Sequence, residues 1–233
     1  MALPKLNTPT YNMTIPSTGH VVDFRPYLVK EEKVLMIAME SDDGLQMNKA
    51  IQNVIAACTF DKVDTNKLTL FDVEYMFATL RSKSVGETSI VTLPCEKCEK
   101  RNEVTINLEE LKVSEKIDNK IPLTSDTGLI MKYPSMADYL DLVNSDLSDI
   151  DKIFGLVAIS IEEIYSGDEV YDTASQTRKE VLEFVESLSA EQFKNVKKYI
   201  DAMPQTYVDA NFKCESCGND NSMKLKGLKN FFN

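Results

Sequence analysis

Histidine is nearly absent from this chain, because His20 is the only one among 233 residues. Ser/His/Asp and Cys/His catalysis both need a histidine to activate the nucleophile. His20 lies beside the turn Ser17–Gly19, and a lone histidine at a turn is more often a surface residue than a general base. We therefore predict a non-enzymatic protein. A hydrolase built on carboxylates such as Glu162 and Glu163 is the weakest alternative.

Glycine clusters and long apolar runs are missing as well. The eight glycines are too scattered to form a loop that cradles phosphate. No apolar stretch approaches the roughly 20 residues that cross a bilayer, and residues 1–10 lack the apolar core of a signal peptide. With 43% hydrophobic residues, the chain is nevertheless expected to bury a core in one or two domains.

Cysteine is scarce, but four of the five cysteines form two Cys-x-x-Cys pairs, Cys95 with Cys98 and Cys214 with Cys217. Two such pairs have the spacing of a tetrahedral zinc site, in which four thiolates occupy every position of the metal. We therefore predict one structural zinc ion (Zn²⁺) per chain and no catalytic metal. Redox or disulfide use is the alternative, although no thioredoxin-like βαβ pattern accompanies the pairs. Cys58, in the apolar run VIAACTF, is interpreted as a core residue.

The residues after each cysteine pair repeat too. Apolar side chains stand six and eight positions after the second cysteine of each pair (Val104, Ile106, Met223 and Leu225). Such alternation is typical of a strand with one buried face. The sequence therefore predicts two similar hairpins that form a split zinc ribbon, with an insertion between its halves, and more than a hundred residues separate Cys98 from Cys214.

The balance of charge disfavours nucleic acid as a partner. The chain has 26 basic and 37 acidic residues, a net charge of −11, whereas phosphate backbones are bound by clustered lysine and arginine. Near the cysteine pairs the only basic patch is a modest one (Lys213, Lys224, Lys226 and Lys229). A zinc-ribbon nucleic-acid-binding regulator is therefore the second functional interpretation.

Residues 1–88 are predicted to form a β-hairpin followed by helices. Side chains alternate on both sides of the turn Pro16–Gly19, which indicates a hairpin. Apolar residues at helical spacing then predict three helices, with a break at Asp42–Gly44, in VKEEKVLMIAMES, LQMNKAIQNVIAAC and FDVEYMFATLRSKSVGE. The aromatic residues of the third segment are interpreted as core.

The insertion, residues 114–204, is predicted to be a β-hairpin around Ser125–Gly128 followed by a bundle of about four helices. The helices are expected in SMADYLDLVNS, DIDKIFGLVAISIEEIYS, TASQTRKEVLEFVESL and, after the capping box Ser189–Gln192, FKNVKKYIDAMP. The predicted fold class is α+β in three parts: residues 1–88, the split ribbon at 89–113 and 205–233, and the insertion.

Three strings of residues stand out because amino-acid composition does not account for their sequences: PTYNMTIPSTGHVVDFRPYLVKEEKVLMIAMES, FDVEYMFATLRSKSVGE and GLIMKYPS. They resemble the base plate protein family of T-even-type contractile-tailed bacteriophages, the baseplate hub assembly proteins. The resemblance spans about the first 135 residues and continues more weakly through the helical region.

The resemblance implies a phage protein without known catalysis that promotes assembly of the baseplate hub, as a chaperone or as a hub component. It implies hub and tail proteins as partners, and the host cytoplasm or the virion baseplate as location; reduced thiols also favour the cytoplasm. Candidate partner contacts lie in RPYLVKEEK and RSKSVGE, at Arg25, Lys30, Arg81 and Lys83. Local salt bridges and helix-end charges are the alternative explanation of these four residues.

Overall fold

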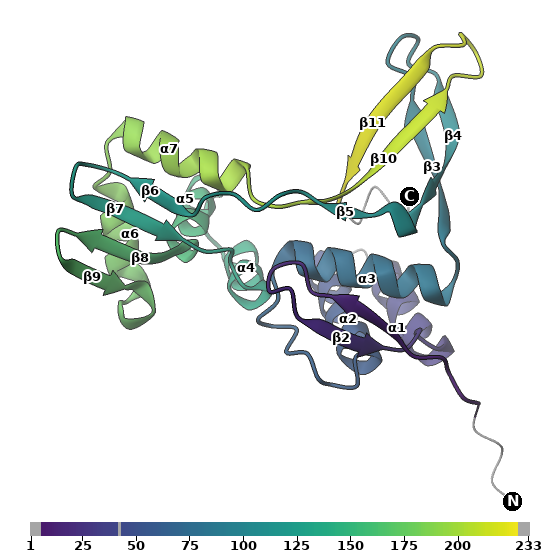
Figure 1. The fold of residues 1–233 in the computed structure, drawn as a ribbon, viewed down its shortest axis with the longest axis horizontal. Helices are drawn as coiled ribbons and strands as arrows, with labels where there is room; N and C mark the ends of the chain where they lie inside the picture. Colours follow the sequence, from purple (N-terminus) through teal and green to yellow (C-terminus); the bar gives the residue numbers. More distant parts are fainter. Residues whose placement is uncertain (1–5, 42, 228–233) are drawn as a thin grey trace, which may run out of the picture. The chain divides into compact units, whose positions relative to one another are not determined.

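A computed structural model describes residues 6–41 and 43–227, and this part of the chain combines seven α-helices with small antiparallel sheets (Figure 1). The chain divides into two compact units. Residues 1–114 and 205–233 form the first, which we call the cysteine unit, and residues 115–204 form the second, which we call the central unit. The α+β class is as predicted, whereas the division of the first unit at residue 88 stays a prediction.

The cysteine unit begins with the expected hairpin, in which Tyr11 pairs with Phe24 across two short strands. Gly19 closes the turn with a left-handed φ of +74°, a conformation that glycine adopts without steric cost. Three helices follow. The elements are β1 (Tyr11–Thr14), β2 (Val21–Phe24), α1 (Val29–Glu40), α2 (Gly44–Cys58) and α3 (Leu70–Ser84).

Asp72 joins the hairpin turn to α3. Its carboxylate accepts hydrogen bonds from the backbone N–H groups of Thr69 (3.0 Å) and Ser17 (2.8 Å), and Asp72 is itself fully buried. The first bond belongs to a capping box that starts α3. Helices α2 and α3 share an apolar core, to which both contribute side chains with no exposed surface (Ile55, Met76 and Leu80).

Two further hairpins of the cysteine unit lie side by side in Figure 1. Side chains along their strands alternate between buried and exposed, so one face of each hairpin enters a shared core with Ala78 of α3. This core contains Val91, Val104, Ile106, Val208, Ala210 and Leu225. The elements are β3 (Thr88–Pro94), β4 (Arg101–Asn107), the short 3-10 helix η1 (Leu108–Glu110), β5 (Lys112–Val113), β10 (Thr206–Lys213) and β11 (Asp220–Lys226); β5 pairs with β10.

The central unit is a four-stranded antiparallel sheet, in the order β6-β7-β8-β9, with four helices. Helices and sheet share one core, to which Leu129, Ile161 and Val196 contribute fully buried side chains. Its elements are β6 (Lys120–Pro122), β7 (Thr127–Met131), α4 (Met136–Val143), α5 (Asp149–Ile159), β8 (Ile161–Ser166), β9 (Glu169–Asp172), the short 3-10 helix η2 (Thr173–Ser175), α6 (Arg178–Glu186) and α7 (Ala190–Asp201).

This segment contains the predicted hairpin, β6 with β7, and four helices, but the helices pack with a four-stranded sheet and do not form a separate bundle. The apolar run DIDKIFGLVAISIEEIYS is not one helix, because α5 ends at Ile159 and the chain continues as strand β8. Ser160, buried at the junction, turns its hydroxyl back to the carbonyl of Leu156. A two-residue turn at Gly167, with a left-handed φ of +59°, then leads into β9. A short apolar run suits a buried strand as well as a buried helix, which is why periodicity alone misassigned it.

Within residues 6–41 and 43–227, none of the helices combines the length and the apolar character needed to traverse a bilayer.

Candidate metal centre

The four paired cysteines meet at one point of the cysteine unit. Cys95 and Cys98 lie in the turn between β3 and β4, and Cys214 and Cys217 lie in the turn between β10 and β11. The sulfurs of Cys95 and Cys217 are 3.7 Å apart, as are those of Cys98 and Cys214, and all four lie within 4.8 Å of one another. Thiolates about 2.3 Å from a tetrahedral ion stand about 3.8 Å apart, so the cluster has the dimensions of a four-thiolate metal site.

Both cysteine turns have the same backbone. In the first, Cys95 N–H donates to the carbonyl of Lys100 (2.9 Å) and Glu99 N–H donates to the carbonyl of Cys95 (2.9 Å). Cys214 and Gly218 repeat these bonds in the second turn, at 2.8 and 2.9 Å. The residue after the second cysteine is left-handed in both, with φ of +60° at Glu99 and +68° at Gly218. Glycine takes this conformation freely, whereas Glu99 adopts it at a cost of about 1–2 kcal/mol.

Two buried asparagines connect the turns to each other. The side-chain carbonyl of Asn102 accepts a hydrogen bond from Glu215 N–H of the opposite turn (3.1 Å). Asn221 does the same for Glu96 N–H (2.9 Å). Each side-chain amide also donates to the carbonyl two residues before it, at 2.8 Å for Asn102 and 3.0 Å for Asn221. The turn of each hairpin is therefore completed by a side chain of the other, and we call these two residues the asparagine clasp.

The clasp was missed by the sequence analysis, although the signal for it is present. Both halves read Cys-x-x-Cys-x-x-x-Asn, as CEKCEKRN and CESCGNDN. An asparagine four positions after the second cysteine falls on a buried position of the following strand. A buried amide needs hydrogen-bond partners, and the facing turn supplies one. Comparison of the two halves beyond their apolar positions would have identified the pair.

The first cysteine of each pair is buried and more acidic than an ordinary thiol. Burial acts to raise the pKa of Cys95, but backbone N–H donors outweigh it and lower that pKa overall. Backbone donors, the N–H of Cys217 foremost, lower the pKa of Cys214 to about 6. The N–H of Lys100 acts to lower the pKa of Cys98, but hydrogen bonds with neighbouring thiols raise it to about 12. The backbone donors thus favour the thiolate form of Cys95 and Cys214, which is the form that binds a metal ion.

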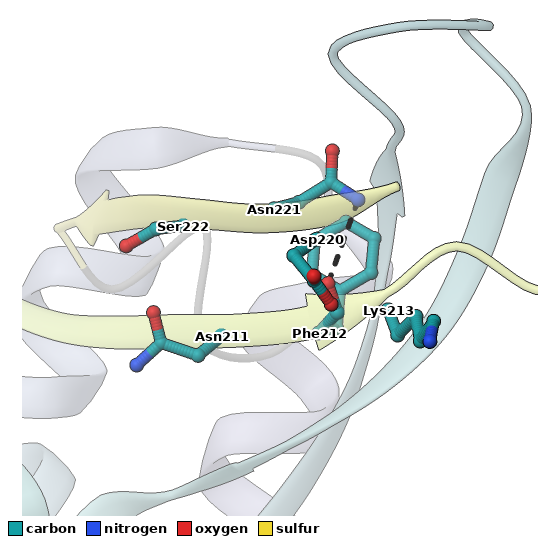
Figure 2. A pocket seen from close by; sticks show the side chains of 6 residues that line it. All are labelled: Asn211, Phe212, Lys213, Asp220, Asn221 and Ser222. Atoms are coloured by element: carbon teal, nitrogen blue, oxygen red, sulfur yellow. Dashed lines mark hydrogen bonds between the residues drawn. The ribbon is translucent and has the colours of Figure 1, made fainter. Parts of the chain in front are cut away.

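A shallow hollow of about 450 Å³ lies beside the second cysteine turn. It is lined by Asn211, Phe212, Lys213, Asp220, Asn221 and Ser222. The labelled side chains do not converge on one point, and the bond drawn between them runs from the Asn221 amide to the Phe212 carbonyl at 3.5 Å (Figure 2). Because Asn221 is one of these lining residues, the hollow borders the asparagine clasp.

Three of the four candidate partner contacts, Arg25, Lys30 and Lys83, form local ion pairs. Arg25 donates to Glu31 at 2.9 Å, and Lys30 approaches the same carboxylate at 3.3 Å. Lys83 pairs with Glu87 at 2.9 Å and also with Glu109. Arg81 is partly buried at the end of α3. These ion pairs match the alternative explanation given by the sequence, and contact with another protein stays a prediction for all four residues.

We expect Asn221→Ala to lower the affinity of the site for its metal by about 10–100-fold, the usual effect of losing a residue that orients the ligands. The change also leaves Glu96 N–H without its acceptor, which costs about 1–3 kcal/mol of unfolding free energy. Competition with a chromophoric chelator measures the affinity. Asn211→Ala, an exposed amide on β10, is the matched control. Equal affinities of the two variants would show that the clasp does not support the centre.

Comparison with known proteins identifies the chain at the level of a family. Residues 8–233, nearly the whole chain, match the T4 bacteriophage base plate protein family, which confirms the resemblance carried by the three strings. No curated protein and no solved structure matches. The chain therefore belongs to the T4 bacteriophage base plate protein family, and its role is in the phage baseplate.

Proposed function

We propose that this protein promotes assembly of the baseplate hub through protein–protein contacts and without catalysis, as a chaperone or as a hub component. The family match over residues 8–233 is the observation that carries the proposal. Other baseplate proteins are its natural partners. The host cytoplasm is the proposed site of action, since thiols stay reduced there.

A zinc ion in a structural role is part of the proposal. Four sulfur donors in tetrahedral arrangement suit zinc or iron–sulfur chemistry, and two Cys-x-x-Cys turns closing on one ion are typical of structural zinc. Cys95, Cys98, Cys214 and Cys217 would fill all four positions. The ion would then hold two hairpins together and offer no open position to a substrate, which supports a role in architecture.

The charge around the metal centre weighs against the nucleic-acid alternative. Nine charged residues lie exposed in the two cysteine turns and at the adjoining strand ends, four basic and five acidic. Phosphate binding needs a basic surface, and here the two signs are mixed. The residues are Lys97, Lys100, Arg101, Lys213, Glu96, Glu99, Glu103, Glu215 and Asp220.

A phage with a stop codon in this gene tests the proposal directly. We expect it to produce no complete baseplate hubs, and a plasmid copy of the wild-type gene to restore them, as seen by electron microscopy and by hub proteins in purified particles. Cys58→Ala, which leaves the cysteine cluster intact, should restore hubs, whereas Cys217→Ser should not.

Purified virions also distinguish a hub component from a chaperone. Mass spectrometry of purified virions should find this chain if it is a hub component and not if it is a chaperone. Normal hubs in its absence would refute the proposal. Salt-sensitive binding of DNA or RNA by the purified protein, together with normal hubs, would favour the nucleic-acid regulator.

A further inference from the structure

Helix α1 carries a set of exposed apolar side chains that the cysteine unit does not cover. Val29 is 80% exposed, Met39 65%, Met36 58%, Ile37 56% and Val34 43%. Single exposed apolar residues are ordinary on a protein surface, but five on a helix of twelve residues mark an interaction site. Two of them are methionines, whose flexible side chains adapt to a partner.

The position of α1 in its unit is set by the opposite face of the helix. Leu35, Ala38 and Glu31 are buried there. Glu31 is fixed by Arg25 and by the N–H of Leu28 (2.8 Å). These buried contacts fix the inner side of α1. The exposed side chains on its outward face therefore have a defined position on the surface of the unit.

The outward face also carries one basic and one acidic residue, Lys33 and Glu40. Val29, Lys33, Met36 and Glu40 follow one another at spacings of four, three and four, so they form one stripe along the helix, with Ile37 beside it. Among the residues that the structure describes, neither Lys33 nor Glu40 has an ion pair. Glu40, the last residue of the helix, lies unfavourably at the negative end of the helix dipole.

We propose that the outward face of α1 binds α1 of a second copy of this chain in an antiparallel pair with two-fold symmetry. With the axis between Met36 and Ile37, Met36 of each copy meets Ile37 of the other. Lys33 lies as far before this point as Glu40 lies after it. Each lysine therefore faces Glu40 of the other copy, and one contact is repeated twice, as a two-fold interface requires.

The same arrangement offsets the unfavourable position of Glu40. In an antiparallel pair, Lys33 of one copy lies beside the negative end of the other helix, where Glu40 stands. The apolar side chains supply the driving force and the charges fix the direction of pairing. One helix of twelve residues offers less than the roughly 800 Å² per partner of a standard interface, so a dissociation constant in the micromolar range is expected.

Sedimentation velocity of the full-length, metal-loaded protein from about 1 to 200 µM tests the pairing over the range expected for an interface of this size. The wild-type protein should shift from monomer to dimer.

Met36→Glu, a change on the exposed face, should leave the thermal midpoint unchanged and keep the protein monomeric. Lys33→Glu and Glu40→Lys should each weaken the dimer about tenfold, since two attractive contacts become repulsive. Lys194→Glu, on an exposed residue of the central unit, makes the same charge change as Lys33→Glu and should have no comparable effect.

Two rescue experiments make the antiparallel register specific. The double variant Lys33→Glu/Glu40→Lys should recover the dimer, and an equimolar mixture of the two single variants should form a heterodimer more tightly than either variant forms a homodimer. A monomer at all concentrations overturns the proposal. So does a dimer that tolerates Met36→Glu, and so does loss of both rescues. If Met36→Glu prevents hub assembly although the wild-type protein is monomeric, a different baseplate protein occupies α1.

Discussion

Cys217→Ser is expected to abolish binding of one metal ion per chain and to lower the free energy of unfolding of the cysteine unit by about 4–5 kcal/mol. The ion would connect Cys217 to Cys95, 122 positions away, and closing a loop of that length restricts the unfolded chain by this amount in the chain-entropy model. Cys217 is exposed, so serine creates no cavity there. Elemental analysis gives the metal content, and denaturant unfolding with and without a chelator gives the stability.

Cys58→Ala is the control for this experiment. Cys58 is fully buried in α2, outside the cysteine cluster, and burial raises the pKa of its thiol to about 11. The variant should keep its metal and lose the packing of one sulfur atom and the weak hydrogen bond from Arg25 to that sulfur (3.8 Å), about 1 kcal/mol in all. Metal-free wild-type protein after purification under reducing conditions would refute the metal centre. Equal stability of Cys217→Ser and the wild type would refute its structural role.

Glu31→Gln is expected to lower the free energy of unfolding by about 3–5 kcal/mol, because it leaves the charge of Arg25 largely buried without its partner. The Arg25 side chain is only 12% exposed and that of Glu31 7%. Glu32→Gln, on the exposed neighbouring residue, is the control and should change little. Thermal or urea unfolding near neutral pH measures both.

The pH dependence of the free energy of unfolding tests whether the Glu31 carboxylate is the cause of this stabilisation. Burial acts to raise the pKa of Glu31, but hydrogen bonds from Arg25 and from Leu28 N–H outweigh it, so the pKa lies below its ordinary value of 4.5. A carboxylate whose pKa is lowered by folding stabilises the protein above its unfolded pKa, and this stabilisation is lost as the pH falls through the folded pKa. The wild type should therefore lose stability more steeply than Glu31→Gln below about pH 4.5. Parallel curves for the two proteins would contradict this assignment.

Local patterns predicted the parts of this fold that depend on neighbours in sequence. The hairpin β1–β2 follows from a turn between alternating strands, and α7 follows from the capping box at Ser189, which the structure contains. The meeting of the four cysteines was predicted because their spacing is that of a four-thiolate metal site. In these cases the physical cause lies within a few residues.

Long-range contacts account for what could not be predicted. Strand β8 is a strand because β7 and β9 pair with both of its edges, and its own apolar side chains would suit a helix equally well. The asparagine clasp depends on hydrogen bonds between residues more than a hundred positions apart. The outward face of α1 reads as an ordinary helix in the sequence, and only its lack of cover in the structure sets it apart.

The order in which a ribosome makes the chain gives the reciprocal asparagine clasp a further consequence. Cys95 and Cys98 emerge first, but the side chain that completes their turn is Asn221, made 125 residues after Glu96. At about 5–20 residues per second, that interval lasts roughly 6–25 s. Throughout it the first two thiols belong to half a site and are open to oxidation or to capture of the wrong metal. An ion held by all four thiolates would therefore be enclosed only after Cys217 and Asn221 have been synthesised, and metal content would distinguish chains that extend past Asn221 from chains interrupted before it.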